Sequence, residues 1–392
     1  MAVKGVFASH QNIVGSRRGD FAAALLQTMP TGMAPMFALS AGMASRDLAD
    51  TVATWFEENH LSGRINITNN AGTGTSLTLS DTTQVVANQV YLIESTGEYV
   101  FIESVSGSVA TVTRGMGSSS ASAVDGSVTP KAMQLIGTAF EEGSAKPTSI
   151  ANVGFPRFNY AQIFRNAWDV TGTAQAIDFY TGPIEAKNRA DALLQHSEAI
   201  ERSSIWGIQA IGTFNGKSFR MMDGIKAQLS TNLKVQSSNT KFYNDVVPFL
   251  RGIFETNIKG QPNERLAFCG NQYVQTINDC ARKDATTYIE PGQQVFGLNV
   301  MKLVTPFGTI NLVTHPLFNE NATFTKDCLI VHPAAIEWRY LRRTHTDDYN
   351  KDGTRAGTDG DFGVVTTEGC ITYKAEKTGG YHSGVDTAAA ST

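Results

Sequence analysis

The chain has 392 residues, enough for two or three domains or for one core with large excursions. Only 17% of the residues are charged, below the roughly 25% usual for soluble domains, which favours a surface that partners cover in part. The net charge of −4 gives no basic footprint of the kind that binds nucleic acid.

Hydropathy and cysteine spacing argue against a membrane-spanning protein, a secreted protein and a protein held by zinc or disulfides. No apolar run approaches the ~20 residues that a membrane-spanning helix needs, and the start, MAVKGVFASHQ, lacks a signal-peptide core. The four cysteines show no C-x-x-C spacing, which favours reduced thiols over zinc ligands or disulfides: Cys269, Cys280, Cys328 and Cys370. We therefore expect a soluble protein made in a reducing compartment.

Residues 1–50 form no obvious globular unit. A short helical pattern, 21–29, is followed by PTGMAPMFALSAGM, which is rich in methionine, alanine and glycine. Methionine adapts to irregular surfaces, and Met33, Met36, Phe37, Leu39 and Met43 would be costly to leave in water. We predict an arm that becomes ordered against a neighbouring subunit, rather than a frayed terminus.

Residues 65–137 change to a composition of valine, threonine, serine and glycine. Short strands separated by turns every 8–12 residues predict a small barrel or sandwich: 77–79, 85–93, 98–105, 109–114 and 128–135. Ser106-Gly107 fits a hairpin turn. The glycines at 72–74 and 115–117 do not lie between a strand and a helix start, so we interpret them as turn residues and not as phosphate-binding loops.

This β-rich segment is flanked by two limbs. Residues 51–64 lead out, and an aromatic-rich stretch at 150–180 returns with alternating polar and aromatic residues from Tyr160 to Trp168. A small domain carried on two connecting segments is suited to contacting another molecule.

The longest predicted element is a helix at 183–211, preceded by a possible cap at Thr181, with Pro183 in the first turn. Small and apolar residues recur every three or four positions and predict one buried face: Ala186, Ala190, Leu193, Ser197, Ile200, Ser204, Ile208 and Ile211. Glu185–Arg189 and Glu198–Arg202 are favourable i,i+4 pairs. We expect this helix to lie close against a sheet.

After a predicted loop at 214–236, helices and strands alternate in one compact domain. We expect helices at 244–258 and 271–281, and strands at 265–269, 298–304, 309–314, 327–331 and 336–341. The segment 361–374 alternates again and is expected to return to the sheet beneath the long helix.

One motif has the spacing of a calcium loop. Asp348 to Gly353 matches D-x-[DN]-x-[DN]-G, and Asp359 stands at loop position 12. An aspartate at position 12, Arg355 at position 8 and the lack of flanking helices favour a polar hairpin with Asx turns instead. We assign no metal ligand here and leave calcium binding as the alternative.

The remaining residues give no catalytic pattern. His315 and His332 precede prolines at strand ends and are expected to make structural hydrogen bonds, whereas His196 is expected to be solvated or at a contact. No G-x-S-x-G elbow and no Cys–His pattern is present, and Cys269 and Cys280 are interpreted as small core residues. We therefore expect no catalytic, cofactor-binding or metal site, and no enzyme activity.

The order of segments resembles the major capsid proteins of tailed bacteriophages, which share the Hong Kong 97 fold. The resemblance covers most of residues 50–385, and 1–50 match least. It is carried by NYAQIFRNAWDVTGTAQAI (159–177), NERLAFCGNQYVQTIND (263–279), FGTINLVTHPLF (307–318), CLIVHPAAIEWRYLRR (328–343) and GVVTTEGCITYKAEKTGGYHSG (363–384). The insertion, ending VSGSVATVTRGMG, resembles a small β module that one branch of the family carries in its extended loop.

The resemblance implies an α+β fold with four parts. These are an N-terminal arm (1–50), an extended loop (51–165) with the β-rich insertion (65–137), a peripheral domain (166–239 and 336–392) containing the spine helix (183–211), and an axial domain (240–335). It implies a shell subunit that forms pentamers and hexamers of an icosahedral capsid. Candidate partners are scaffolding, portal and decoration proteins and weakly contacted double-stranded DNA, with assembly in the bacterial cytoplasm and no membrane.

Two alternatives stay open at this point. An encapsulin-like compartment protein would share the fold, although the β insertion favours a phage capsid. A tail tube or decoration protein would be dominated by strands and would lack a long helix.

Overall fold

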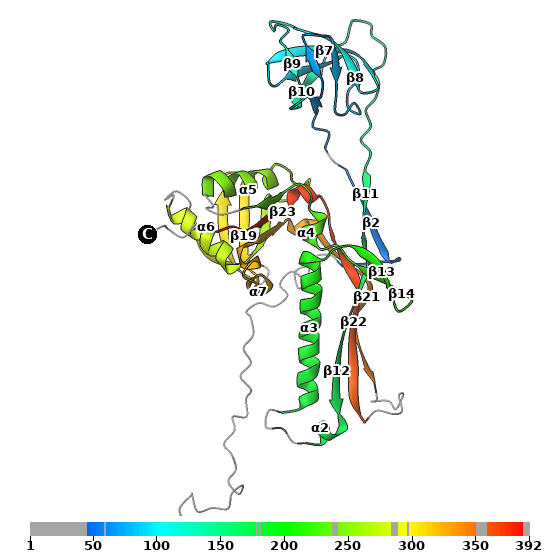
Figure 1. Ribbon diagram of the computed structural model, residues 1–392, viewed down its shortest axis with the longest axis vertical. Helices are drawn as coiled ribbons and strands as arrows, with labels where there is room; N and C mark the ends of the chain where they lie inside the picture. The colour runs from blue at the N-terminus through cyan, green and yellow to red at the C-terminus, as the bar shows by residue number, and fades with distance from the viewer. Residues whose placement is uncertain are drawn as a thin grey trace, which may run out of the picture. The chain divides into compact units, whose positions relative to one another are not determined.

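The computed structural model describes residues 45–58, 60–177, 179, 182–236, 242–283, 289–295, 298–349 and 359–386. The chain divides into two compact units, unit 1 (1–55 and 157–392) and unit 2 (56–156) (Figure 1). Helices and strands mix in unit 1, which confirms the α+β class. No helix in the described part of the chain is long and apolar enough to cross a membrane. The helix predicted at 21–29 lies outside the described residues.

A four-stranded sheet supports the long helix in unit 1. Its order is β1-β21-β22-β12, with these bounds: β1 (Ser45–Asp47), β21 (Ile336–Tyr349), β22 (Gly360–Tyr373) and β12 (Gln162–Thr171). Helix α3 (Ile184–Trp206) lies along β12 and β22, and the short α2 (Gly172–Ala176) precedes it (Figure 1). The predicted return of 361–374 to the sheet beneath the helix is confirmed.

Helix α3 ends earlier than the predicted 211. The Gly207 amide closes the last turn by donating to the Ser203 carbonyl at 2.9 Å, and the Gly224 amide donates to the Gly207 carbonyl at 3.0 Å. A Cβ at Gly207 would stand 2.6 Å from the Met222 carbonyl oxygen, so this close approach requires glycine. Ile208 and Ile211 consequently leave the helix. At the other end the N-cap is Pro183, and Thr181 lies outside the described residues.

The buried face of α3 also differs from the prediction. It consists of Ala192, His196, Ile200, Glu201, Ser204 and Ile205. Ile200 and Ser204 were predicted correctly, but Ala186, Ala190 and Leu193 are exposed, and Leu193 keeps 41% of its surface. The error arose because the buried stripe passes through His196 and Glu201, which a hydrophobic period does not select.

A seven-stranded sheet forms the rest of unit 1. Its order is β15-β23-β20-β16-β19-β18-β17, with these bounds: β15 (Leu233–Val235), β23 (Gly380–Ser383), β20 (Cys328–Val331), β16 (Glu264–Cys269), β19 (Gly308–Thr314), β18 (Leu298–Thr305) and β17 (Ile289–Val295). The shorter helices of this region are α4 (Ile225–Gln228), α5 (Val247–Phe254), α6 (Asn271–Lys283) and α7 (Pro316–Asn319). A π-helical turn (Phe242–Val246) precedes α5, and 3-10 turns lie at Phe324–Lys326, Pro333–Ala335 and Glu376–Thr378.

Strand β16 divides the interior of unit 1 because side chains alternate across a strand. Leu266 and Phe268 join the core that contains Ile200 of α3. Ala267 and Cys269 join the core beneath α5 and α6. Both faces of the strand are covered, which explains its nearly continuous apolar sequence.

The predicted loop at 214–236 is wrong. Strands β13 (Ala210–Phe214) and β14 (Lys217–Met221) form an antiparallel hairpin, and α4 and β15 follow. Asn215 and Gly216 both have positive φ, the conformation of a two-residue hairpin turn. The polar composition of this turn concealed the strands on either side of it.

Unit 2 is a closed six-stranded barrel. Its order is β3-β10-β6-β7-β8-β5, with these bounds: β3 (Arg64–Ile67), β10 (Lys131–Thr138), β6 (Gln89–Ile93), β7 (Glu98–Ser106), β8 (Val109–Thr113) and β5 (Ser76–Thr78). A bridge between Ile67 and Leu79 joins the first and last strands. The structure thus selects the barrel from the two predicted forms, with the turn at Gly107 where expected.

Two further ladders have two strands each. Strand β4 (Asn70–Gly72) pairs with β9 (Val124–Asp125) beside the barrel. Strand β2 (Val52–Glu57), by which the chain enters unit 2, pairs with β11 (Phe155–Tyr160), by which it leaves.

The position of the buried stripe predicts different outcomes for two substitutions on α3. Ile200→Asp should abolish soluble folding, since Ile200 is completely buried and the new carboxylate would have no counter-charge. Leu193→Asp should leave the subunit folded, because the side chain stays in water. Soluble yield and circular dichroism of the two variants, prepared in parallel, would check this, and equal insolubility would contradict the placement.

Candidate assembly surfaces

A polar contact holds the middle of α3 to the sheet. The His196 ring joins Asn166 of β12 through Nδ1 at 3.0 Å and Thr367 of β22 through Nε2 at 2.7 Å. Thr367 in turn contacts Thr344 of β21 at 2.8 Å. Burial lowers the pKa of His196. Of the two expected positions for His196, solvated or at a contact, the solvated one was wrong, because the facing strands supply partners that the helix sequence does not show.

A second polar contact joins α3 to the seven-stranded sheet. His315 Nε2 lies 2.7 Å from Glu201 Oε1, and both side chains are completely buried. His315 Nδ1 accepts the Leu317 amide at 3.2 Å, so Nε2 carries the proton and donates it to Glu201. The predicted structural role of His315 is confirmed, and its carboxylate partner was not foreseen.

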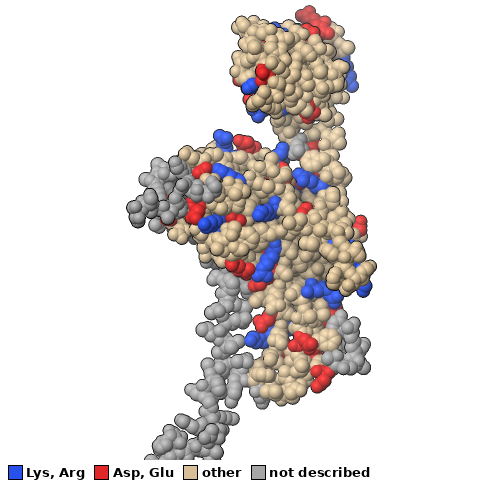
Figure 2. All heavy atoms as spheres, viewed as in Figure 1, with Lys and Arg blue, Asp and Glu red and all other residues tan. Residues whose placement is uncertain are grey.

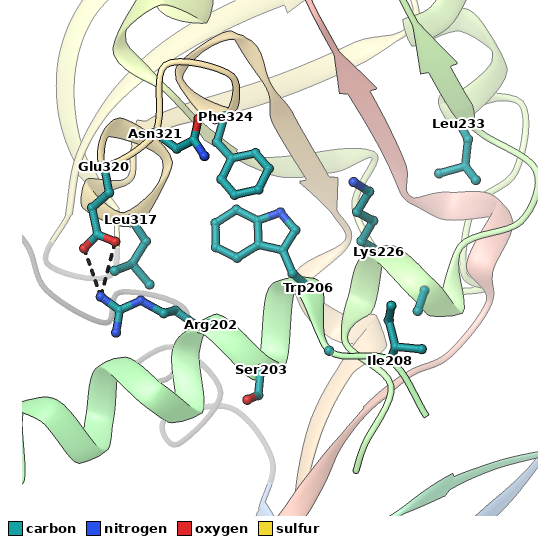
Figure 3. A pocket seen from close by; sticks show the side chains of 12 residues that line it. Arg202, Ser203, Trp206, Ile208, Lys226, Leu233, Leu317, Glu320, Asn321 and Phe324 are labelled. Atoms are coloured by element: carbon teal, nitrogen blue, oxygen red, sulfur yellow. Dashed lines mark hydrogen bonds and ion pairs between the residues drawn. The ribbon is translucent and has the colours of Figure 1, made fainter. Parts of the chain in front are cut away.

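An apolar groove opens at the C-terminal end of α3. It has a volume of about 840 Å³ and lies between α3, α4, β15 and the segment of α7. Figure 3 shows Trp206 at its centre, with Phe324 on one side and Ile208 and Leu233 toward the other. Trp206 stacks on Phe324 with ring centroids 4.8 Å apart.

Charged residues border this groove. Arg202 pairs with Glu320 at 3.0 Å, and Figure 3 shows this pair and Lys226 on opposite sides of the tryptophan. Lys226 places its ammonium group 4.3 Å from the centroid of the Tyr381 ring. The groove therefore has an aromatic floor and a polar rim, the anatomy of a protein-binding surface.

The hairpin β13–β14 contacts the neighbouring sheet through one side chain, Arg220. Arg220 donates from Nε to the Ala161 carbonyl at 3.3 Å and pairs with the buried Glu368 at 3.3 Å. Cross-strand pairing places Phe214, Phe219 and Met221 together on the opposite face, where Phe214 is 72% exposed. An isolated hairpin is marginally stable in water, so this apolar face is suited to a protein partner.

A buried ion pair organises the loops of unit 2. Arg114 makes two hydrogen bonds to the Glu98 carboxylate, at 2.7 and 2.6 Å, and also reaches the carbonyls of Gly74 and Ser122. The amides of Gly115 and Ser122 donate to the same carboxylate. Burial alone would raise the pKa of Glu98, but these hydrogen bonds outweigh it and lower that pKa. Arg114 thus ties the glycine turns together, in agreement with their interpretation as turns.

The other predicted residues fall into structural positions. His332 caps a turn by accepting the Ala334 amide at 3.1 Å, as expected. Cys269, Cys328 and Cys370 are buried free thiols. The Sγ atoms of Cys269 and Cys328 lie 3.0 Å apart. The side chain of Cys280 lies outside the described residues.

The calcium motif falls mostly on 350–358, outside the described residues. Asp348, at its start, pairs with Arg189 of α3 at 3.4 Å. The described residues bring no three histidine, cysteine, aspartate or glutamate side chains into a metal-binding group. Figure 2 shows acidic and basic residues interspersed among a majority of uncharged ones on the viewed face of unit 1.

Comparison with known proteins decides the family. The model of the SU10 major capsid protein family matches residues 6–386. This chain belongs to that family of capsid proteins. The resemblance to phage major capsid proteins inferred above is thereby confirmed.

Individual relatives are distant. The major capsid protein of Pseudomonas phage PaMx41 is 26% identical over 361 residues, covering 89% of this chain and 85% of the relative. Among solved structures, the capsid of Cyanophage P-SCSP1u is similar, with a TM-score of 0.47 and 10% identity. The match covers 94% of this chain and 93% of the cyanophage chain. The match to the SrpI encapsulin of Synechococcus elongatus PCC 7942 (TM-score 0.44, 9% identity) covers 62% of this chain and 80% of the encapsulin chain.

Two ion pairs in the barrel of this capsid-family chain predict opposite outcomes. Arg114→Met should destabilise unit 2 by roughly 3–5 kcal/mol, because it leaves the Glu98 carboxylate buried without its counter-charge. Arg64→Met removes an equally short pair, Arg64–Glu94 at 2.6 Å, but an exposed one, and should change little. Hydrogen exchange of β7 and β8 in the full chain would measure both, and equal effects would contradict the assigned burial.

Two buried histidines predict loss of stability in mild acid. Burial lowers the pKa of His332 and of His382 to about 4, aided by Arg265 and Lys234 respectively. The unfolded chain takes up these protons near pH 6.5, so stability is complete above about pH 6.5 and falls as the pH decreases to about 4, by at most about 3 kcal/mol per histidine.

The substitution His332→Asn keeps an acceptor for the Ala334 amide and removes one titrating group. Chemical unfolding of disassembled subunits between pH 8 and 4.5 should therefore show a shallower pH dependence for the variant. Both proteins are compared at pH 8, where the histidines are neutral, as the control. If the free energy of unfolding of the two proteins changes with pH in parallel, His332 does not cause the loss of stability in acid.

Proposed function

We propose that this chain is a phage major capsid protein that self-assembles, as pentamers and hexamers, into the icosahedral shell that encloses the double-stranded DNA genome. The observation that carries the proposal is the family match over 381 of 392 residues (6–386). The name of the PaMx41 relative, major capsid protein, supports it. In this role the protein acts by binding copies of itself, with no catalytic, cofactor or metal site, and assembles in the cytoplasm of the bacterial host.

The parts of the chain have distinct roles in this proposal. Residues 1–50 are an arm that binds a neighbour, and 51–165, with the β-rich insertion 65–137, form an extended loop over an adjacent subunit. The peripheral domain (166–239 and 336–392) and the axial domain (240–335) build the shell wall on the Hong Kong 97 plan. One core contains side chains of both domains, Ile200 and Trp338 of the peripheral domain with Leu266 of the axial domain, which supports a continuous wall.

Closed rings suit the surfaces described above. Pentamers and hexamers are head-to-tail assemblies, in which two different surfaces of each subunit meet. The apolar face of β13–β14 is one such surface on unit 1. The net charge of −4 suits a wall that faces packaged DNA with only weak contacts, and scaffolding, portal and decoration proteins are the further partners.

Electron microscopy of the purified protein tests the proposal. Isometric particles with five- and six-fold capsomers, and phage DNA in particles taken from lysates, are the expected result. Filaments would indicate a tail-tube protein, and closed shells that carry protein cargo instead of a genome would indicate an encapsulin-like compartment. Either of these outcomes would overturn the assignment.

Removing unit 2 should separate folding from assembly. Replacing residues 61–150 with a Gly/Ser linker of about ten residues, enough to join β2 to β11, should leave unit 1 soluble and folded, since the barrel has its own core. The yield of closed shells should fall or their size should change, as seen by microscopy and sedimentation. Aggregation like that expected of Ile200→Asp would show that the boundary of unit 2 is misplaced.

A further inference from the structure

The groove at the end of α3 exposes apolar side chains that no other described residue covers. Ile208 is 68% exposed and Leu233 is 49% exposed, and both line the groove with Trp206 and Phe324. Its charged residues stand at the rim, where Arg202 is already paired with Glu320. The open floor therefore favours an uncharged, apolar occupant over a charged peptide.

The chain contains one segment of matching chemistry. Residues 29–43, MPTGMAPMFALSAGM, carry no charge and include Met33, Met36 and Phe37. Methionine side chains are flexible and make favourable contacts with aromatic rings, which suits an irregular floor built from a tryptophan and a phenylalanine. A groove of about 840 Å³ accommodates several such side chains.

The segment ends close enough to reach the groove. It is followed by β1, where Ser45 pairs with Trp338 of β21. Trp338 lies in the core on which Trp206 and Phe324 also pack, so the described chain begins at the core that the groove borders. Fifteen extended residues span up to about 50 Å, so a segment that joins β1 can extend along the core toward the groove.

We propose that residues 29–43 bind in this groove, with their methionine and phenylalanine side chains against Trp206 and Phe324. The contact gives the arm a fixed seat and removes Ile208 and Leu233 from water. Residues 29–43 of either the same copy or an adjacent copy can occupy the groove. It does not require shells to form, so its outcome is separate from that of microscopy.

Cysteine pairs in the full chain test the contact directly. Met36→Cys is combined with Ile208→Cys, with Leu233→Cys, or with Val304→Cys as the control, an exposed valine (51%) of β18 outside the groove. A bismaleimide should cross-link the two groove pairs roughly tenfold more than the control pair, because a bound segment has a high local concentration. Cross-links within or between chains both support the proposal, and yields equal to the Val304 control overturn it.

Methionine oxidation gives a second readout without cysteines. In the unsubstituted chain Met33 and Met36 should react slowly with hydrogen peroxide, as measured by mass spectrometry. Ile208→Asp, a surface change that introduces a charge into the groove, should raise their oxidation rates several-fold, whereas Val304→Asp should not. Identical rates in the two variants would overturn the proposal.

Discussion

The buried contact between Glu201 and His315 joins the long helix to the seven-stranded sheet, and the arrangement of unit 1 depends on it. Both groups lie entirely out of water at 2.7 Å, and the histidine is fixed by the Leu317 amide. Removing one partner of a buried hydrogen bond costs roughly 1–3 kcal/mol. One turn earlier, His196 makes the equivalent connection to the four-stranded sheet. The helix is therefore oriented by directional contacts and not by apolar packing alone.

This orientation decides which surfaces remain for other subunits. With the stripe through His196 and Ile200 turned inward, Leu193 points to water and Gly207 ends the helix beside Gly224. The chain then continues into a hairpin that presents Phe214 outward and into the wall of the groove at Trp206. Apolar surface left in water on a subunit becomes a driving force when the shell closes, since burial of that surface is favourable and not directional.

Unit 2 follows a different principle. It is a closed barrel with its own core, and closure leaves few unpaired strand edges that could bind other chains at random. Its long turns are held by the Glu98–Arg114 pair, which satisfies backbone groups from two separate loops, the turn at Gly74 and the loop between β8 and β9. A module of this kind can be carried within a capsid subunit without contributing to the core of unit 1.

The amino-acid sequence by itself determined the class, the family and most of the elements. Period-2 alternation located β22 and the barrel strands other than β3 (Arg64–Ile67), and the glycine-serine turn located the hairpin at Gly107, because these signals are local. The order of segments was sufficient to indicate a capsid protein. The tertiary structure alone decided which face of α3 is buried, because Asn166, Thr367 and His315 come from distant strands and convert His196 and Glu201 into interior residues. It also decided that Leu193 and Phe214 are exposed, since the side of a helix or hairpin that meets the core depends on partners far away in the chain.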